Sequence, residues 1–321
     1  MSAVAGLIAV CCFTLFGSEL RAQDPARIPV IVDTDIGTDI DDAFALALLL
    51  QCPELELRGI TTVSGDAPLR ARLAAKLLSL AGDPWGGVPV YAGTTGPVQP
   101  LAQGEWARDF TAPNLHLSGG VEFLRDEINR HPGRITLLAL GELTNIAALL
   151  TDNPRIAGRI RRIVLMGGAL ARGYDDGSPA VPEWNIRSNV AAARTVFASG
   201  VPLTMVPLDV TIMLKLDAGA RARIFSHGTP VNAALAALTA TWQGTNPWKL
   251  VHPVLFDSLP VALLARPALA ETMARHIEIA PDGLTRAWPG APNADVVVRA
   301  PPEEFFAFNH VRLSAPSAPV R

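Results

Sequence analysis

Short apolar runs alternate along most of the chain with longer segments in which apolar residues recur every three or four positions. The short runs predict buried strands, and the periodic segments predict helices. Strands are predicted at Ile28–Val32, Leu57–Val63, Ile135–Leu140, Arg162–Met166 and Leu203–Leu208. Helices are predicted at Ala43–Leu50, Leu69–Leu80, Val121–Asn129, Leu143–Leu150, Val190–Ala198, Asn232–Trp242 and Phe256–Ala265. This alternation indicates an α/β fold with a mostly parallel central sheet and helices on both faces.

Segments without such periodicity are expected to be loops. Gly86–Pro113 is rich in Gly and Pro and is predicted to be a long surface loop. Arg172–Pro182 has a similar composition and is predicted to form a mobile flap. After Ala265 the pattern predicts less regular strands. Because no linker or internal repeat interrupts the alternation, residues 23–321 are expected to form a single domain.

The first residues of the chain have a different character. From Ala3 to Gly17 the sequence is almost continuously apolar, over a stretch too short to span a membrane as a helix. Ala22 closes the polar stretch that follows, where a signal peptidase can cut. Residues 1–22 are therefore predicted to be a signal peptide, and the mature protein to be exported, periplasmic or secreted, without stable membrane association. A retained anchor, a misassigned start codon and a lipoprotein anchor at Cys11 are the alternatives.

The amino-acid composition and net charge limit which classes of molecule the protein is expected to bind. The chain is 49% hydrophobic and 18% charged, as expected for a protein with a large core. Its net charge of -3 and its scattered arginines give no electrostatic footprint for nucleic acid, so no nucleic-acid partner is expected. The lysines are Lys76, Lys215 and Lys249, and no phosphate-binding G-x-x-x-x-G-K-[ST] string is present.

Acidic side chains gather directly after the first predicted strand. The segment from Asp33 to Asp42 holds five carboxylates in ten residues. Like charges this close repel one another unless a cation neutralises them, and oxygen ligands suit calcium or magnesium. Aspartates that only cap the next helix would account for Asp41 or Asp42 but not for the whole set. Because parallel sheets bind ligands beyond the carboxyl ends of their strands, the segment is predicted to be a metal site.

Further motifs follow this acidic segment in a fixed order. They are Ile60–Gly65 (ITTVSG), Gly141–Ala147 (GELTNIA), Val164–Gly168 (VLMGG), Glu183–Asn185 (EWN) and Asp257 before an apolar helix. Together with the D-x-D-x-G…D-D-A string that begins at Asp33, they resemble the inosine-uridine preferring nucleoside hydrolase family. The resemblance covers nearly all of residues 23–321. It implies that family's Rossmann-like fold, an active site at the carboxyl ends of the strands, and hydrolysis of ribonucleosides to ribose and a free base.

The resemblance also implies a role for each matching residue. It implies a calcium ion held by Asp35, Asp42, the backbone carbonyl of Leu140 and Asp257. Asp35 would be the general base that takes a proton from a calcium-bound water, which attacks the anomeric carbon of the ribose. Substrate contacts are implied for Asp41, Asp39, Asp66, Met166, Glu183, Trp184 and Asn185. Related proteins form homodimers or homotetramers, and the expected ligand is a small-molecule ribonucleoside.

Two departures from the family's pattern concern ribose binding. The gap between Asp35 and Asp41 is two residues longer than in the best-known members, so either Asp39 or Asp41 can take the ribose-binding role. Asp66 stands where a ribose-binding Asn is usual, and an ionised carboxylate accepts hydrogen bonds but does not donate them.

A third departure concerns the leaving base. Phe256 stands where some members of the family have a His. His252 is therefore the candidate acid that protonates the base. Alternatively, Trp184, Trp242 and Trp248 can stack on the base and raise its proton affinity, or serve only in packing.

Two other functions remain open at this point. A phosphatase of the haloacid dehalogenase type also begins with a strand and D-x-D, but Asp257 has no acidic neighbour in the sequence, and Lys215 is the one lysine near a strand end. A calcium- and ribose-binding protein without catalysis is the second alternative, because Phe256 and Asp66 depart from the enzyme pattern.

Overall fold

The computed structural model describes residues 27–97, 100–175 and 177–314. The predicted signal peptide, residues 1–22, lies outside this part of the chain. Among the helices described, none combines the length and apolar character needed to cross a membrane.

One sheet runs through the described residues and contains ten strands. They are β1 (Ile28–Thr34), β2 (Leu55–Thr62), β3 (Val90–Ala92), β4 (Leu115–His116), β5 (Thr136–Ala139), β6 (Arg162–Met166), β7 (Leu203–Val206), β8 (Glu271–Ile279), β9 (Thr285–Trp288) and β10 (Ala294–Arg299). The strand order is β4-β3-β2-β1-β5-β6-β7-β10-β8-β9. Neighbours from β4 to β10 pair in parallel, whereas β8 is antiparallel to both β10 and β9. The chain first adds β2, β3 and β4 on one side of β1 and then adds β5, β6 and β7 on the other side. Parallel sheets bind ligands where the strand order changes direction in this way.

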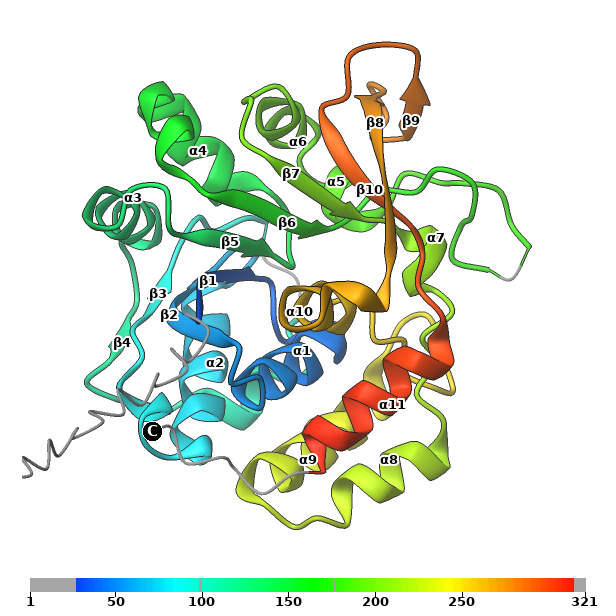
Figure 1. The fold of residues 1–321 in the computed structure, drawn as a ribbon. Helices are drawn as coiled ribbons and strands as arrows, with labels where there is room; N and C mark the ends of the chain where they lie inside the picture. The colour runs from blue at the N-terminus through cyan, green and yellow to red at the C-terminus, as the bar shows by residue number, and fades with distance from the viewer. Residues whose placement is uncertain (1–26, 98–99, 176, 315–321) are drawn as a thin grey trace, which may run out of the picture.

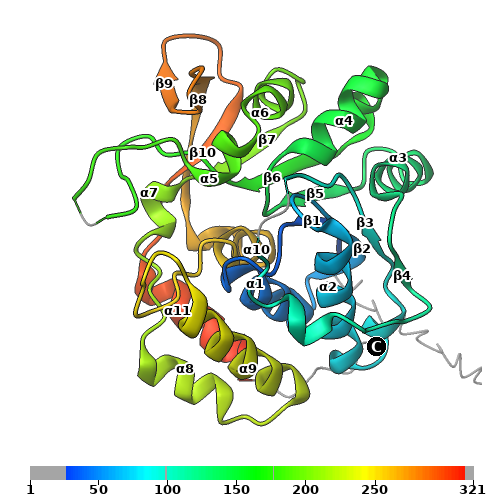
Figure 2. The ribbon, with the colours of Figure 1, turned by 180° about the vertical axis from the view of Figure 1, so that it is seen from behind.

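Helices cover both faces of the sheet. They are α1 (Asp41–Leu50), α2 (Ala67–Ala81), α3 (Gly120–Arg130), α4 (Thr144–Asp152), α5 (Trp184–Ser188), α6 (Val190–Phe197), α7 (Leu208–Thr211), α8 (Ala218–Phe225), α9 (Pro230–Thr245), α10 (Ser258–Ala265) and α11 (Pro302–Leu313). The two opposite views show α3, α4 and α6 on one side of the sheet and α1, α2 and α10 on the other (Figures 1 and 2). Helices α8, α9 and α11 form an outer layer beyond α1 (Figure 1). The predicted α/β fold with helices on both faces is confirmed.

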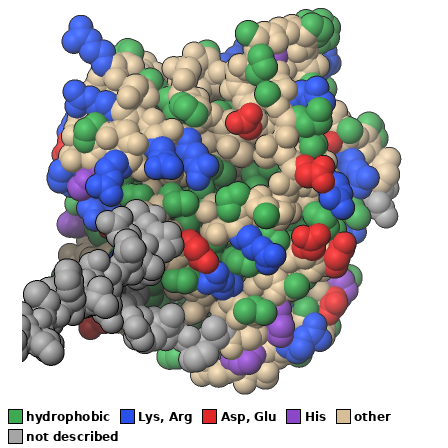
Figure 3. Space-filling model, viewed as in Figure 1, with side chains coloured by type: hydrophobic (Ala, Val, Ile, Leu, Met, Phe, Trp, Pro, Cys, Tyr) green, Lys and Arg blue, Asp and Glu red, His purple; other side chains and the backbone are tan. Residues whose placement is uncertain are grey.

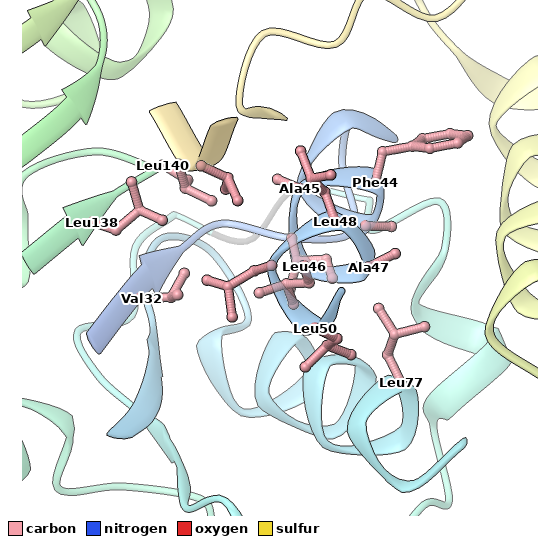
Figure 4. Packing of buried hydrophobic residues seen from close by; sticks show 14 of the residues in the cluster. Val32, Phe44, Ala45, Leu46, Ala47, Leu48, Leu50, Leu77, Leu138 and Leu140 are labelled. Carbon is pink, nitrogen blue, oxygen red and sulfur yellow. The ribbon is translucent and has the colours of Figure 1, made fainter. Parts of the chain in front are cut away.

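The core explains why β1 and α1 hold their positions. All residues of β1 except Ile28 are buried, and every residue of α1 is buried. Phe44, Leu46 and Leu48 of α1 are fully buried between the sheet and the surrounding helices (Figure 4). Removing each of these side chains from water contributes about 1.5–3 kcal/mol. The loop between β1 and α1 is therefore held at both ends by well-packed elements.

The structure corrects the sequence-based expectation in three segments. Gly86–Pro113 is not simply a surface loop, because it contains β3, which pairs with β2 at residues 90–92. The predicted strand at Leu203–Leu208 ends at Val206, because Pro207 begins a new turn and α7 starts at Leu208. The segment after Ala265 is more regular than predicted, since it forms β8, β9, β10 and α11.

The surface carries charges of both signs. On the face viewed in Figure 3, most basic side chains lie on the left and most acidic ones on the right, among apolar and neutral side chains. This distribution agrees with the small net charge of -3.

Candidate active site

The carboxyl ends of the central strands carry the acidic residues predicted from the sequence. β1 ends at Thr34, and the segment from Asp35 to Ile40 leads into α1, which starts with Asp41 and Asp42. Asp257 lies at the N-terminal cap of α10. The helix ends direct their unpaired backbone N–H groups toward this region, which favours negative charge there.

Three carboxylates from the two helices form a compact group. Asp41, Asp42 and Asp257 are buried, and one oxygen from each lies within 4.8 Å of the others. The Thr34 hydroxyl donates a hydrogen bond to Asp42 and fixes its orientation. Burial, and then repulsion from the neighbouring carboxylates, raises the pKa of each of the three aspartates. A divalent cation with oxygen ligands relieves that repulsion, so this donor set fits a hard metal ion.

Asp35 lies beside this group and is only half-buried. Burial raises the pKa of Asp35, and the positive charge of Arg70 opposes that effect. Gly141 brings the end of β5 close to Asp35, since a Cβ at position 141 would lie 2.9 Å from the Asp35 amide nitrogen. The backbone carbonyl of Leu140 accepts a hydrogen bond of 2.8 Å from the Asn185 side chain. That Asp35 and the Leu140 carbonyl bind the metal stays a prediction.

Arg70 is a buried cation that the sequence analysis did not single out. It extends from α2, and its guanidinium donates to the backbone carbonyls of Asp35, Ile36 and Ser64 and to the Thr38 hydroxyl. Arg70 is only 4% exposed. It therefore holds the loop between β1 and α1 and places positive charge next to the acidic group. Its only signal in the sequence is an arginine on a face that is otherwise apolar.

Asp33 belongs to the acidic segment but has a separate structural function. Its carboxylate accepts hydrogen bonds from the Thr61 hydroxyl, at 2.6 Å, and from the Asn145 side chain, at 2.7 Å. Burial raises the pKa of Asp33 to about 7, although both hydrogen bonds favour the ionised form. Asn145 also donates to the backbone carbonyl of Thr62 and accepts from the backbone of Thr94. Asp33 and Asn145 thus connect β1, β2 and α4.

The predicted ribose-binding residues on β6 and α5 come together. The Glu183 carboxylate accepts hydrogen bonds from the backbone of Gly168 at 2.9 Å and of Asn185 at 3.0 Å. The Asn185 side chain donates to the backbone carbonyls of Leu140 and Met166. These bonds fix the ends of β5 and β6 against α5 and leave Glu183 buried. Burial raises the pKa of Glu183, whereas the backbone N–H groups oppose that rise.

Two other predicted ribose-binding residues take part in local hydrogen bonds. One carboxylate oxygen of Asp66 caps α2 by accepting from the backbone of Leu69 at 2.9 Å. Asp39 is half-buried and accepts from the backbone of Ile40 at 2.7 Å. Burial raises the pKa of Asp39 to about 6. The choice between Asp39 and Asp41 as the ribose contact stays open.

The residues that were predicted to protonate the leaving base or to stack on it lie in different environments. The Nδ1 atom of His252 lies 3.2 Å from the Arg221 guanidinium. Because Arg221 only donates, that nitrogen is an acceptor. Trp242 is fully buried in the core, so its interpretation as a base-stacking residue is wrong. Trp248 is 45% exposed, and Trp184 is half-buried with Arg187 over its ring at 4.9 Å.

This arrangement defines a class of protein. A half-buried carboxylate beside three buried ones, at the carboxyl edge of a parallel sheet, is typical of a metal-dependent hydrolase. Residues 30–307 match the profile of the family described as inosine-uridine preferring nucleoside hydrolase. The chain therefore belongs to this family and is an N-glycosidase of the ribonucleoside hydrolase type.

Individual relatives agree with this assignment. The pyrimidine-specific ribonucleoside hydrolase RihA of Salmonella agona is 31% identical over 272 residues, which cover 80% of this chain and 85% of that protein. The uncharacterized protein C1683.06c of Schizosaccharomyces pombe is 37% identical over 229 residues, or 65% of this chain and 70% of that protein. Among solved structures, the purine-preferring ribonucleoside hydrolase from Gardnerella vaginalis has a TM-score of 0.75 at 29% identity. It matches over 89% of this chain and 98% of its own.

Proposed function

We propose that the protein hydrolyses the N-glycosidic bond of ribonucleosides in a calcium-dependent reaction, releasing ribose and a free base. The observation that carries this proposal is the buried group of Asp41, Asp42 and Asp257 next to the half-buried Asp35. Acidic groups this close are costly to bury without a cation, so their retention in a closed site argues for a bound metal.

The metal would be held by Asp35, Asp42, Asp257 and the Leu140 carbonyl, with Asp41 near enough to take part. A bound divalent cation lowers the pKa of a coordinated water and orients it. Asp35 accepts the proton of the attacking water, because its carboxylate is half-buried and lies beside the buried acidic group. Arg70 keeps the Asp35 backbone in place while this happens.

The ribose would be held at its hydroxyl groups. Asp41, Glu183 and Asn185 are the buried polar groups that would contact these hydroxyls, with Met166 next to Asn185, and the half-buried Asp39 and Asp66 are further candidates. Buried acceptors left without a partner by a deoxyribose would cost binding energy, so we expect ribosides to be preferred. As positive charge develops on the ring, the surrounding carboxylates stabilise it.

Cellular location and assembly belong to the same proposal. Residues 1–22 would direct export, and the mature chain would work in the periplasm or outside the cell. It would assemble as a homodimer or homotetramer. Mass analysis of the secreted protein and light scattering of the purified protein test these two points directly.

The reaction is tested by measuring ribose released from inosine, adenosine, uridine and cytidine, with calcium and with chelator. Both purine and pyrimidine substrates are needed, because RihA is named for pyrimidine specificity and the Gardnerella enzyme for a purine preference. Calcium-dependent release that is lost in Asp35→Asn supports the proposal. Binding of nucleosides without turnover would instead support a binding protein.

A further inference from the structure

Tyr174 lies beside the candidate site, near the carboxylates of Glu183 and Asp41, and has no role in the proposed function. It belongs to the long loop between β6 and α5, which extends outward beside α7 (Figure 1). Its ring meets the ring of Phe256 edge to face, with centroids 6.3 Å apart and planes at 81°. Phe256 directly precedes Asp257 of the acidic group. Tyr174 is 41% exposed, so a ligand can reach it.

The hydroxyl of Tyr174 has a defined orientation. Its oxygen accepts a hydrogen bond of 2.9 Å from the backbone N–H of Trp184. Within the described part of the chain, no hydrogen bond is found in which this hydroxyl donates. Burial of the hydroxyl, with the nearby carboxylate of Glu183, raises the pKa of Tyr174 well above its usual range. The hydroxyl therefore keeps its proton at neutral pH and has that proton free to donate.

The loop that carries Tyr174 is anchored by specific contacts. The Asp209 carboxylate accepts hydrogen bonds from the backbone N–H groups of three successive residues, Leu170 at 2.8 Å, Ala171 at 2.6 Å and Arg172 at 3.2 Å. Gly173 follows, where a Cβ would lie 2.5 Å from the Ser178 hydroxyl and 2.6 Å from the Pro179 carbonyl. Only glycine allows this close return of the chain. The position of Tyr174 is thus fixed by the loop.

We propose that the Tyr174 hydroxyl donates a hydrogen bond to the leaving base and stabilises it as it departs. This inference rests on the proposed function. The carboxylates that would hold the ribose, Asp41 and Glu183, are buried, whereas the ring of Tyr174 is exposed and meets Phe256 edge to face. A base that faces outward from the buried carboxylates would lie against the exposed ring of Tyr174, with its ring acceptor atoms within reach of the hydroxyl.

The reaction step balances without a further reagent. The bond between the anomeric carbon and the base nitrogen breaks, and its electron pair moves to the base. Tyr174 stabilises the negative charge through its hydrogen bond and keeps its own proton. The base then takes up a proton from water, while the attacking water gives its oxygen to the ribose and its proton to Asp35.

The test is a comparison of two leaving groups in Tyr174→Phe, which retains the ring and its contact with Phe256. For uridine and inosine we expect kcat to fall by about 100-fold, because a donor to the departing charge is lost. For p-nitrophenyl β-D-riboside, whose phenolate leaves without such help, we expect a loss below about threefold. Tyr91→Phe is the matched control, since Tyr91 is the other tyrosine of the chain and stacks on His116 and Phe123. It should change neither rate.

Every other outcome counts against the inference. An equal loss on both substrates would mean that the hydroxyl binds the ribose that they share. Unchanged rates in Tyr174→Phe, or a selective loss on nucleosides in His252→Asn instead, would assign the leaving base to another residue. If the unmodified protein hydrolyses neither nucleosides nor the nitrophenyl riboside with calcium, the proposed function itself fails, a result distinct from loss of discrimination in the variant.

Discussion

Strands β1 and β8 belong to the same sheet but have opposite environments. β1 lies in the parallel part, with helices on both faces, and six of its seven residues are buried. β8 lies in the antiparallel end, and its first five residues are all exposed. Both strands have acidic residues nearby. Only those after β1 are enclosed, so only there do carboxylates interact strongly with one another.

The buried carboxylates after β1 and the exposed carboxylate on β8 therefore differ in how strongly they interact with other charges. Burial, and then repulsion from nearby carboxylates that little water screens, raises the pKa values of Asp41, Asp42 and Asp257. Glu271 on β8 instead pairs with Arg299 on β10 at 2.7 Å, with side chains 65% and 61% exposed. Solvated pairs of this kind contribute little to stability. A buried acidic group calls for a cation, whereas an exposed ion pair needs no functional explanation.

The largest expected effect comes from removing a charge in the enclosed group. Asp257→Asn should lower kcat/KM for nucleosides by about 1,000-fold, or about 4 kcal/mol, because the metal site loses a ligand. The matched control is Glu271→Gln, which removes a carboxylate from the exposed strand and should change kcat/KM by less than about twofold. Equal effects of the two substitutions on kcat/KM would show that the enclosed carboxylate is no more important for the reaction than the exposed one.

A second prediction concerns the cation that supports the enclosed loop. Arg70→Leu should lower the free energy of unfolding by about 3 kcal/mol, because it leaves backbone carbonyls near Asp35 without donors. Arg70→Lys keeps the charge but not the forked geometry and should recover only part of this loss. Urea denaturation of the three proteins measures the difference. A loss of unfolding free energy below about 0.5 kcal/mol in Arg70→Leu would show that the loop between β1 and α1 is stable without the arginine.

Calcium and pH should affect stability in linked ways. An Asp carboxyl has an ordinary pKa of 3.8, whereas the pKa of Asp33 in the folded protein is about 7, so the native state binds more protons than the unfolded state between these values. In chelator, the stability that Asp33 contributes should therefore be greatest at low pH and fall as pH rises through about 7. Calcium at 100 times its Kd should add about 2.7 kcal/mol at pH 8. Thermal denaturation at several pH values, with and without calcium, tests both the effect of pH and the effect of calcium. Stability in chelator that rises toward pH 8 would contradict the predicted effect of pH.

The smallest effect is expected at the exposed end of the sheet. A double-mutant cycle with Glu271→Ala and Arg299→Ala should give a coupling energy below about 1 kcal/mol, which disappears at high salt. A larger coupling that persists in salt would show that the exposed pair is shielded, as it would be in a homo-oligomer that covers this end.

Much of the fold was predictable because parallel strands and their covering helices leave local patterns. β1, β2, β5 and β6 were placed within a few residues of their bounds from their apolar runs. β3 was missed because three residues between Gly and Pro give too little periodicity. α8 was also missed, since four of its eight residues are alanine or glycine, which leave little apolar contrast.

The acidic residues of the candidate site were named from the sequence, whereas some residues that contact them or their loops were not. The order of the motifs singled out Asp41, Asp42 and Asp257, although the gap between Asp35 and Asp41 is two residues longer than in the best-known members. Arg70 and Tyr174 were not singled out, because their contacts join residues that lie apart in the sequence. A side chain that bonds to distant backbone atoms leaves no periodic signal.

The sequence by itself determined the α/β class, the acidic segment after β1 and the family, because these depend on local hydrophobic runs and on motifs in a fixed order. The tertiary structure decided that Asp257 joins Asp41 and Asp42, that Asp33 bonds to Asn145 instead, and that Tyr174 meets Phe256 next to Asp257. Those contacts depend on the strand order and on where loops return, and both are set by packing between distant parts of the chain.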